Sequence, residues 1–211
     1  MRIFVGLFEV ATLNKRQRYQ TAIESVAKIM YFDTVGMINT NDTAALALKA
    51  AVEKNIKYIV VASSRGDTAK LLTNTNEINI ICVTHANGYP EPGKSEMSQE
   101  IRNELVDLGI EVLTTTHVLS GAERGISKSF GGAYPVEIIA HSLRMLGQGT
   151  KVCVEVSIMA LDAGLIPYGE PIIAIGGSGK GADTAVILTP SHASSIFETK
   201  IHEIICKPGR Y

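Results

Sequence analysis

From Ile29 onward, short apolar runs rich in β-branched residues alternate with segments of helical periodicity, and this alternation limits the possible folds most strongly. The clearest runs are residues 57–62 (KYIVVA) and 78–83 (INIICV). Strands that alternate with helices form a mostly parallel sheet whose two faces are covered by helices. The sequence therefore predicts an α/β fold, a three-layer sandwich.

The predicted sheet is mostly parallel and has about five strands. Besides the two runs above, strands are predicted at 29–32, 110–113, 171–175 and 184–188. The loop between the last two is too short for a crossover helix, so they should pair antiparallel at one edge of the sheet. A further apolar run follows at 201–206.

Helices are predicted between these strands. One extends from Asn41 or Asp42 to about Asn55, and its expected buried face is Ala44, Leu48, Ala51 and Val52. A later helix, which Gly147 ends, is expected to bury Ile138, Ile139, Leu143 and Leu146. The stretch 114–132 is interpreted as a polar, Gly-rich connection.

The chain is predicted to comprise an N-terminal extension, residues 1–28, and one α/β domain, residues 29–211. The extension contains a polar helix at about 14–28. Residues 29–211 contain no internal repeat and no segment typical of an interdomain linker.

Composition excludes several classes of protein. The formal net charge is -1, without the basic excess of a nucleic-acid-binding protein. No apolar run reaches the roughly 18 residues of a membrane span, and no small-residue cleavage site follows the apolar start. The three cysteines lie among apolar residues without metal-ligand spacing. We therefore expect a cytoplasmic protein with buried thiols, no metal site, and no nucleic-acid or membrane partner.

The strongest local signal for a ligand is the segment VVASSRGDTA, where a buried strand ends in a polar loop and a helix begins. The first N–H groups of a helix have no internal acceptor and favour an anion. Ligands of α/β sheets also bind at the carboxyl ends of strands. The predicted phosphate-binding residues are Ser63, Ser64, Arg65, Gly66, Asp67 and Thr68. Capping of the helix by Ser64 or Asp67 explains the pattern equally well.

A second candidate is the loop IGGSGKGAD near the end of the chain. It differs from a Walker A motif, because Gly181 follows the lysine and a strand follows the loop. A flexible loop with one cation can fold over a phosphate, whereas a mobile hairpin loop is the alternative. The candidate ligand residues are Gly177, Ser178, Gly179, Lys180 and Gly181.

Polar residues of the 114–132 stretch should lie at the same edge of the sheet. His117, Ser120 and Arg124 are candidate ligand contacts, and Arg124 suits a phosphate or carboxylate. In the apolar helix KVCVEVSIMALDAG, Glu155 and Asp162 lie on one face and need partners if they are buried. Candidate catalytic groups are His117, Glu155, Asp162 and Lys180, although structural roles are open for all of them.

Several motifs in order resemble those of the pyruvate kinase alpha/beta domain-containing family, whose members are similar to the C-terminal domain of pyruvate kinase. They are YFDTVGMINTNDTA, SSRGDTA, HVLSGAERGISKSFGG, KVCVEVSIMALDAGLIP, GGSGKGADTAVIL and EIICKPG. The resemblance covers residues 29–209 and includes a strand that ends at Val83 and Thr84. It implies the pyruvate kinase C-terminal fold and a phosphorylated ligand, such as flavin mononucleotide (FMN) or a sugar phosphate, bound at 63–68, with Thr84 nearby.

Three functions agree with this resemblance. The first is binding of a small phosphorylated ligand by a homo-oligomer. The second is an enzyme acting on that ligand, for example a flavin-dependent oxidoreductase. The third is a regulatory or assembly domain. The catalytic barrel of pyruvate kinase has no counterpart in the sequence, so pyruvate kinase activity is not expected.

Overall fold

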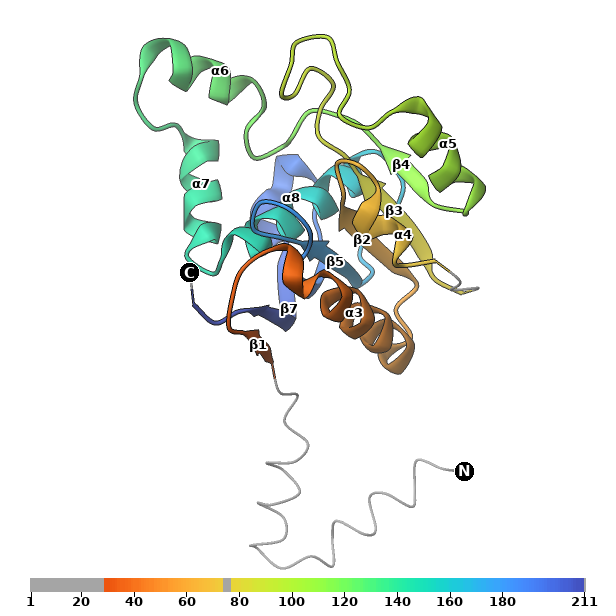
Figure 1. The fold of residues 1–211 in the computed structure, drawn as a ribbon. Helices are drawn as coiled ribbons and strands as arrows, with labels where there is room; N and C mark the ends of the chain where they lie inside the picture. Colours follow the sequence, from red (N-terminus) through yellow and green to blue (C-terminus); the bar gives the residue numbers. More distant parts are fainter. Residues whose placement is uncertain (1–28, 74–76, 211) are drawn as a thin grey trace, which may run out of the picture.

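A computed structural model describes residues 29–73 and 77–210, and these form a single seven-stranded sheet with helices on both faces (Figure 1). The strand order is β1-β7-β6-β5-β2-β3-β4. The strands are β1 (Met30–Phe32), β2 (Tyr58–Ala62), β3 (Asn79–Val83), β4 (Glu111–Leu113), β5 (Ile172–Gly176), β6 (Thr184–Thr189) and β7 (Lys200–Pro208). The predicted α/β sandwich is confirmed.

Strand β6 is the one antiparallel member among the strands that the structure describes, and it pairs with β5 as the short loop predicts. It does not lie at the edge of the sheet, because β7 pairs antiparallel with its other side and β1 then pairs parallel with β7. The described sheet has seven strands, whereas about five were predicted. One of the additional strands is β7, whose centre is the apolar run at 201–206.

Each face of the sheet has its own hydrophobic core. Helices α3 (Thr40–Lys54), α4 (Asp67–Lys70) and α5 (Gln99–Asp107) cover one face, where Ile59, Val61 and Ile173 point. Helix α8 (Gln148–Asp162) covers the other face and packs on Val60 and Ala174. Strands alternate between these two cores because successive side chains point to opposite faces.

The buried side of α3 matches the predicted one at Ala44, Ala51 and, in part, Leu48, but not at Val52. Ala44, Ala47 and Ala51 are buried, whereas Val52 is 74% exposed. Small alanines allow the helix to approach the sheet closely. Asn55 ends the helix in a left-handed conformation with φ of 54°.

Helices α6 (Gly121–Phe130) and α7 (Pro135–Arg144) form an arm that projects at the upper left of Figure 1. We call residues 121–144 the α6–α7 arm. Helix α6 lies in the stretch interpreted as a connection, and none of its residues is buried. Helix α7 packs mainly on α8. Ile138 and Leu146 are exposed rather than buried, whereas Ile139 and Leu143 are partly buried.

Two 3₁₀ helices complete the fold, η1 (Met37–Asn39) before α3 and η2 (Ala193–Glu198) before β7. Cys82, Cys153 and Cys206 are buried free thiols, as expected. Among the described residues, no helix is long and apolar enough to cross a membrane. The predicted extension, residues 1–28, lies outside the described residues.

Candidate functional site

The carboxyl ends of four neighbouring parallel strands meet at one edge of the sheet, which we call the carboxyl rim. Val61 of β2 lies opposite Ile175 of β5, so the loops after Ala62 and Gly176 leave the sheet side by side. Strands β3 and β4 follow in the same direction on the other side of β2. The predicted ligand loops at 63–68, 114–120 and 177–181 therefore all begin at this rim.

The loop after β2 is held in place by its own serine. Ser63 is buried, and its Oγ accepts the Thr68 N–H at 3.3 Å. Gly66 has φ of 86°, and a Cβ there would lie 3.0 Å from Ile101 and 3.1 Å from Leu105 of α5. The positive φ and the packing against α5 therefore explain the glycine at this position.

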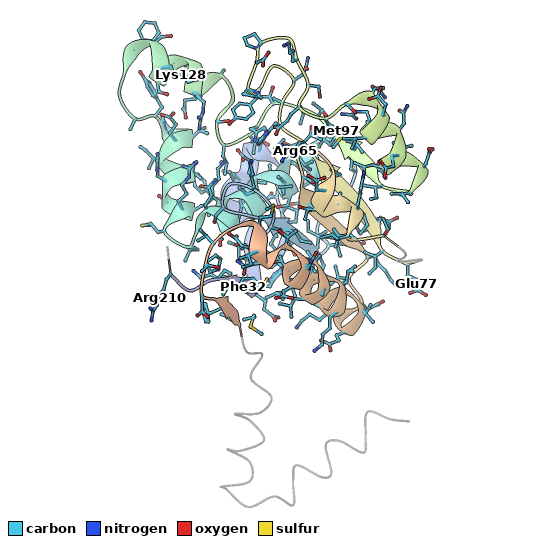
Figure 2. The ribbon with its side chains drawn as sticks, in the orientation of Figure 1. Phe32, Arg65, Glu77, Met97, Lys128 and Arg210 are labelled. Carbon is cyan, nitrogen blue, oxygen red and sulfur yellow. The ribbon has the colours of Figure 1, made fainter. Side chains whose placement is uncertain are left out.

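The backbone N–H groups of residues 64–67 have no acceptor within the described part of the chain. Helix α4 that follows has only four residues, so its dipole adds little to these individual groups. Arg65 is half-exposed and lies 3.8 Å from the carboxylate of Asp67. Figure 2 labels Arg65 at the start of this loop. The loop thus presents consecutive N–H donors and one cation.

The loop after β5 is organised by a buried carboxylate. Oδ2 of Asp183 accepts the N–H groups of Gly36 at 2.8 Å and Ser178 at 3.2 Å, while Oδ1 accepts the Thr184 hydroxyl at 2.8 Å. The Ala182 N–H is donated to Oγ1 of Thr40 at 3.0 Å. These bonds join the loop to the start of α3 and limit its freedom, in contrast to a mobile hairpin.

Within this loop some polar groups stay without protein partners. Oγ of Ser178 is buried and has no hydrogen-bond partner among the described residues. The N–H groups of residues 179–181 likewise meet no acceptor in the described segments. Lys180 is exposed. Buried polar atoms are usually hydrogen-bonded, so the Ser178 hydroxyl is an exception among the described residues.

Thr84 follows β3 and lies inside a hydrogen-bonded group rather than in an open site. Its Oγ1 lies 2.6 Å from Oγ1 of Thr114, which also accepts a hydrogen bond from Arg102. Arg102 donates a second hydrogen bond to the Val112 carbonyl at 3.0 Å. These contacts fix the ends of β3 and β4 beside each other.

His117 and Glu155, two separately predicted candidates, lie in contact. Nδ1 of His117 is 3.3 Å from Oε2 of Glu155, and Nζ of Lys151 is 2.5 Å from the same oxygen. The Leu119 N–H donates to the other oxygen at 3.0 Å. Glu155 is 2% exposed and Lys151 is 6% exposed, so this ion pair is shielded from water. Lys151 is a site residue that its place in an apolar helix did not indicate.

The charges of this cluster follow from its contacts. Burial alone would raise the pKa of Glu155, but the His117 hydrogen bond and the Lys151 charge outweigh it and lower the pKa to about 2. Burial lowers the pKa of Lys151, and the attraction of Glu155 offsets only part of this effect. Arg144 and Arg124 lower the pKa of Lys151 further by repulsion.

His85 also belongs to this region, although it was not among the predicted site residues. Its Nδ1 lies 2.7 Å from Oε2 of Glu96, and its ring centroid is 5.7 Å from that of His117. Tyr89 packs edge-on against His85 at 4.6 Å. The position of His85 directly after Thr84, at a strand end, was the available signal.

Of the remaining predicted residues, Asp162 lies outside this region, whereas the Arg124 charge is near enough to act on Lys151. Asp162 ends α8, far along the helix from the rim, and it binds Nδ1 of His192 at 2.7 Å and the Ala193 N–H at 3.2 Å. Ser120 and Arg124 lie at the start of α6, where the Ser120 carbonyl accepts the Arg124 N–H. No group of three or more metal-ligating side chains is formed by the described residues.

Comparison with known proteins gives one family and a set of solved structures. The family model "Pyruvate kinase, alpha/beta domain" matches residues 41–188. Among solved structures, one pyruvate kinase from Cryptosporidium parvum is 19% identical, with 80% of this chain and 25% of that chain covered and a TM-score of 0.35. A Cryptosporidium parvum pyruvate kinase in complex with ADP is 18% identical, with 90% and 27% covered and a TM-score of 0.37. The chain thus spans about a quarter of the length of these pyruvate kinases.

Proposed function

This chain belongs to the pyruvate kinase alpha/beta domain family, and from that premise we propose that it binds a small phosphorylated ligand at the carboxyl rim. The phosphate lies between the loops that follow β2 and β5. FMN is one ligand of this kind, and a sugar phosphate is another. The observation that carries the proposal is the pair of adjacent loops, residues 64–67 and 179–181, whose N–H groups have no acceptor among the residues that the structure describes.

Phosphate oxygens accept several hydrogen bonds at once, and consecutive backbone N–H groups at a strand end suit them well. Arg65 and Lys180 supply positive charge from the two sides of the site, one on each loop. The buried Ser178 hydroxyl is a further donor without a protein partner. The hydrogen bonds that the Asp183 carboxylate accepts hold the loop after β5 in place. A loop that is already ordered loses less conformational entropy when a ligand binds.

Isothermal titration calorimetry with FMN, fructose 1,6-bisphosphate and inorganic phosphate tests the proposal. We expect at least one of the three to bind, with an affinity that falls as salt is raised. Replacement Lys180→Ala should weaken binding by about tenfold, because one charged hydrogen bond is lost. The absorbance spectrum of the purified protein shows directly whether FMN accompanies it.

Lys128→Ala is the matched control, because Lys128 is also an exposed lysine but lies on α6, in the outer part of the arm (Figure 2). The Lys128→Ala variant should bind the ligand with the same affinity as the unaltered protein. Absence of binding by all three compounds, or equal weakening by the two lysine variants, would rule out this phosphate site.

A further inference from the structure

Two histidine–carboxylate pairs lie next to each other beside the proposed phosphate site. His85 Nδ1 contacts Glu96 Oε2 at 2.7 Å, and His117 Nδ1 contacts Glu155 Oε2 at 3.3 Å. The two rings are 5.7 Å apart between centroids and inclined by 42°. The segments that carry them, after β3 and β4, run side by side at the top of Figure 1.

The buried pair fixes the orientation of His117. Both oxygens of Glu155 are occupied, one by Lys151 and His117 and the other by the Leu119 N–H. In the neutral tautomer that donates its Nδ1–H to the Glu155 carboxylate, Nε2 keeps its lone pair. Nε2 of His117 is buried and has no hydrogen-bond partner among the described residues. It is therefore a basic nitrogen that structural hydrogen bonding does not use.

His85 is the outer member of the two. Its side chain is 41% exposed, compared with 23% for His117. The Glu96 carboxylate likewise occupies Nδ1 of His85. Two imidazoles that are each held by a carboxylate, one shielded and one open to solvent, can serve as a base and an acid in a single site.

We propose that His117 and His85 form a proton-transfer site that acts on a carbonyl compound whose phosphate occupies the carboxyl rim, an inference that rests on the proposed function. The substrate class is a 2-hydroxycarbonyl phosphate. Nε2 of His117 removes the proton from the carbon next to the carbonyl, and the imidazolium of His85 gives a proton to the carbonyl oxygen. One C–H bond and one N–H bond of His85 break, while an N–H bond of His117 and an O–H bond form. The C–H electron pair becomes the C=C bond of the enediol, and the carbonyl π pair takes up the proton on oxygen. Reversal of these transfers at the neighbouring carbon completes an isomerisation without another reactant.

Proton exchange with solvent measures this step directly. The protein is incubated in D₂O with dihydroxyacetone phosphate, ribose 5-phosphate or fructose 6-phosphate, and ¹H NMR follows loss of the signal next to the carbonyl. We expect exchange with at least one compound to exceed the protein-free rate by about 100-fold or more. His117→Gln should remove this acceleration, while the affinity for inorganic phosphate, which occupies only the rim loops, changes less than about twofold in calorimetry. His141→Gln is the control, because His141 is an exposed histidine of α7.

Two further measurements separate catalysis from a structural effect. Added imidazole should restore part of the exchange in His117→Gly, which a structural role of the side chain does not predict. In ¹⁵N NMR, His117 should show a protonated Nδ1 and an unprotonated Nε2, and this pattern should be lost in the double variant Lys151→Met, Glu155→Leu. That variant removes the buried charges together, so neither remains unpaired.

The outcomes distinguish the two proposals. Binding of these phosphates without accelerated exchange by the unaltered protein overturns the proton-transfer site and leaves the proposed function intact. Absence of phosphate binding overturns both. Exchange that survives in His117→Gln overturns the assignment of the base.

Discussion

Asp183 and Gly36 are joined by a hydrogen bond of 2.8 Å between the buried Oδ2 carboxylate oxygen and the backbone N–H, across 147 residues of sequence. This bond connects the loop after β5 with the segment that precedes α3. Since Ser178 donates to the same oxygen, one side chain determines where both segments lie.

Replacement of Asp183 by Ala should destabilise the protein by about 2–4 kcal/mol, because two N–H donors and the Thr184 hydroxyl lose their acceptor. Asp183→Asn keeps an acceptor oxygen and should cost less. Urea unfolding followed by circular dichroism measures both variants. Equal stability of Asp183→Ala and the unaltered protein would show that other groups hold these segments.

Two glycines of the same loop allow a matched comparison of steric effects. A Cβ at Gly181 would lie 2.4 Å from Oγ1 of Thr40 and 2.7 Å from Cα of Met37, whereas one at Gly179 would meet nothing within 4 Å. Both have positive φ, 74° and 85°. We expect Gly179→Ala to cost about 1 kcal/mol from backbone strain alone and Gly181→Ala clearly more, about 3 kcal/mol or above. Thermal unfolding gives the difference, and similar values for the two variants would contradict the close packing.

The buried Glu155 should make stability depend on acid pH. Folding lowers its pKa from 4.5 to about 2, so the ionised carboxylate contributes fully above about pH 4.5 and its contribution is lost as the pH falls toward 2. The amount is on the order of 3 kcal/mol. Denaturant unfolding at pH 6.5 and pH 3 should show a smaller loss for Lys151→Met, Glu155→Leu than for the unaltered protein. A parallel decline of both proteins would assign acid sensitivity to other carboxylates.

The thiols should be unreactive in the folded protein. Burial raises the pKa of Cys82 to about 12 and that of Cys206 to about 11, and it also raises the pKa of Cys153. A disulfide reagent at pH 8 should therefore label none of the three rapidly, because the thiolate is the reacting form. All three should be labelled in 6 M guanidinium chloride. Fast labelling without denaturant would indicate local opening of the sheet.

Strong apolar runs made the central strands predictable. Residues 57–62 and 78–83 match β2 and β3 closely, because buried parallel strands are apolar on both faces. Helix α6 was not predicted, since its glycines and serines lower helix propensity and none of its residues contributes to a core. The apolar periodicity of α7 predicted a face buried on the sheet, but the helix packs mainly on α8. Periodicity alone does not show which element a helix packs against, so the exposure of Ile138 could not be predicted.

The candidate site could be predicted only where loops follow strands. The segments 63–68 and 177–181 were identified by their composition and position, and their common edge follows from the β2–β5 pairing. The contact between His117 and Glu155 depends on how α8 crosses the sheet, and sequence spacing carries no such information. Spacing instead grouped Glu155 with Asp162, which lies at the other end of α8 and binds His192.

The position of β5 has a consequence for how the chain reaches its native state. Strand β2 pairs with β5 on one side, and β2 is fully synthesised once Ala62 is added. The β5 residues that pair with it, beginning at Ile173, are synthesised about 110 residues later. A nascent chain that lacks them exposes an open, apolar strand in the middle of the future sheet, which is the kind of surface that promotes aggregation. Folding should therefore finish only after synthesis of the last third of the domain, and premature termination there should yield insoluble product rather than a smaller stable domain.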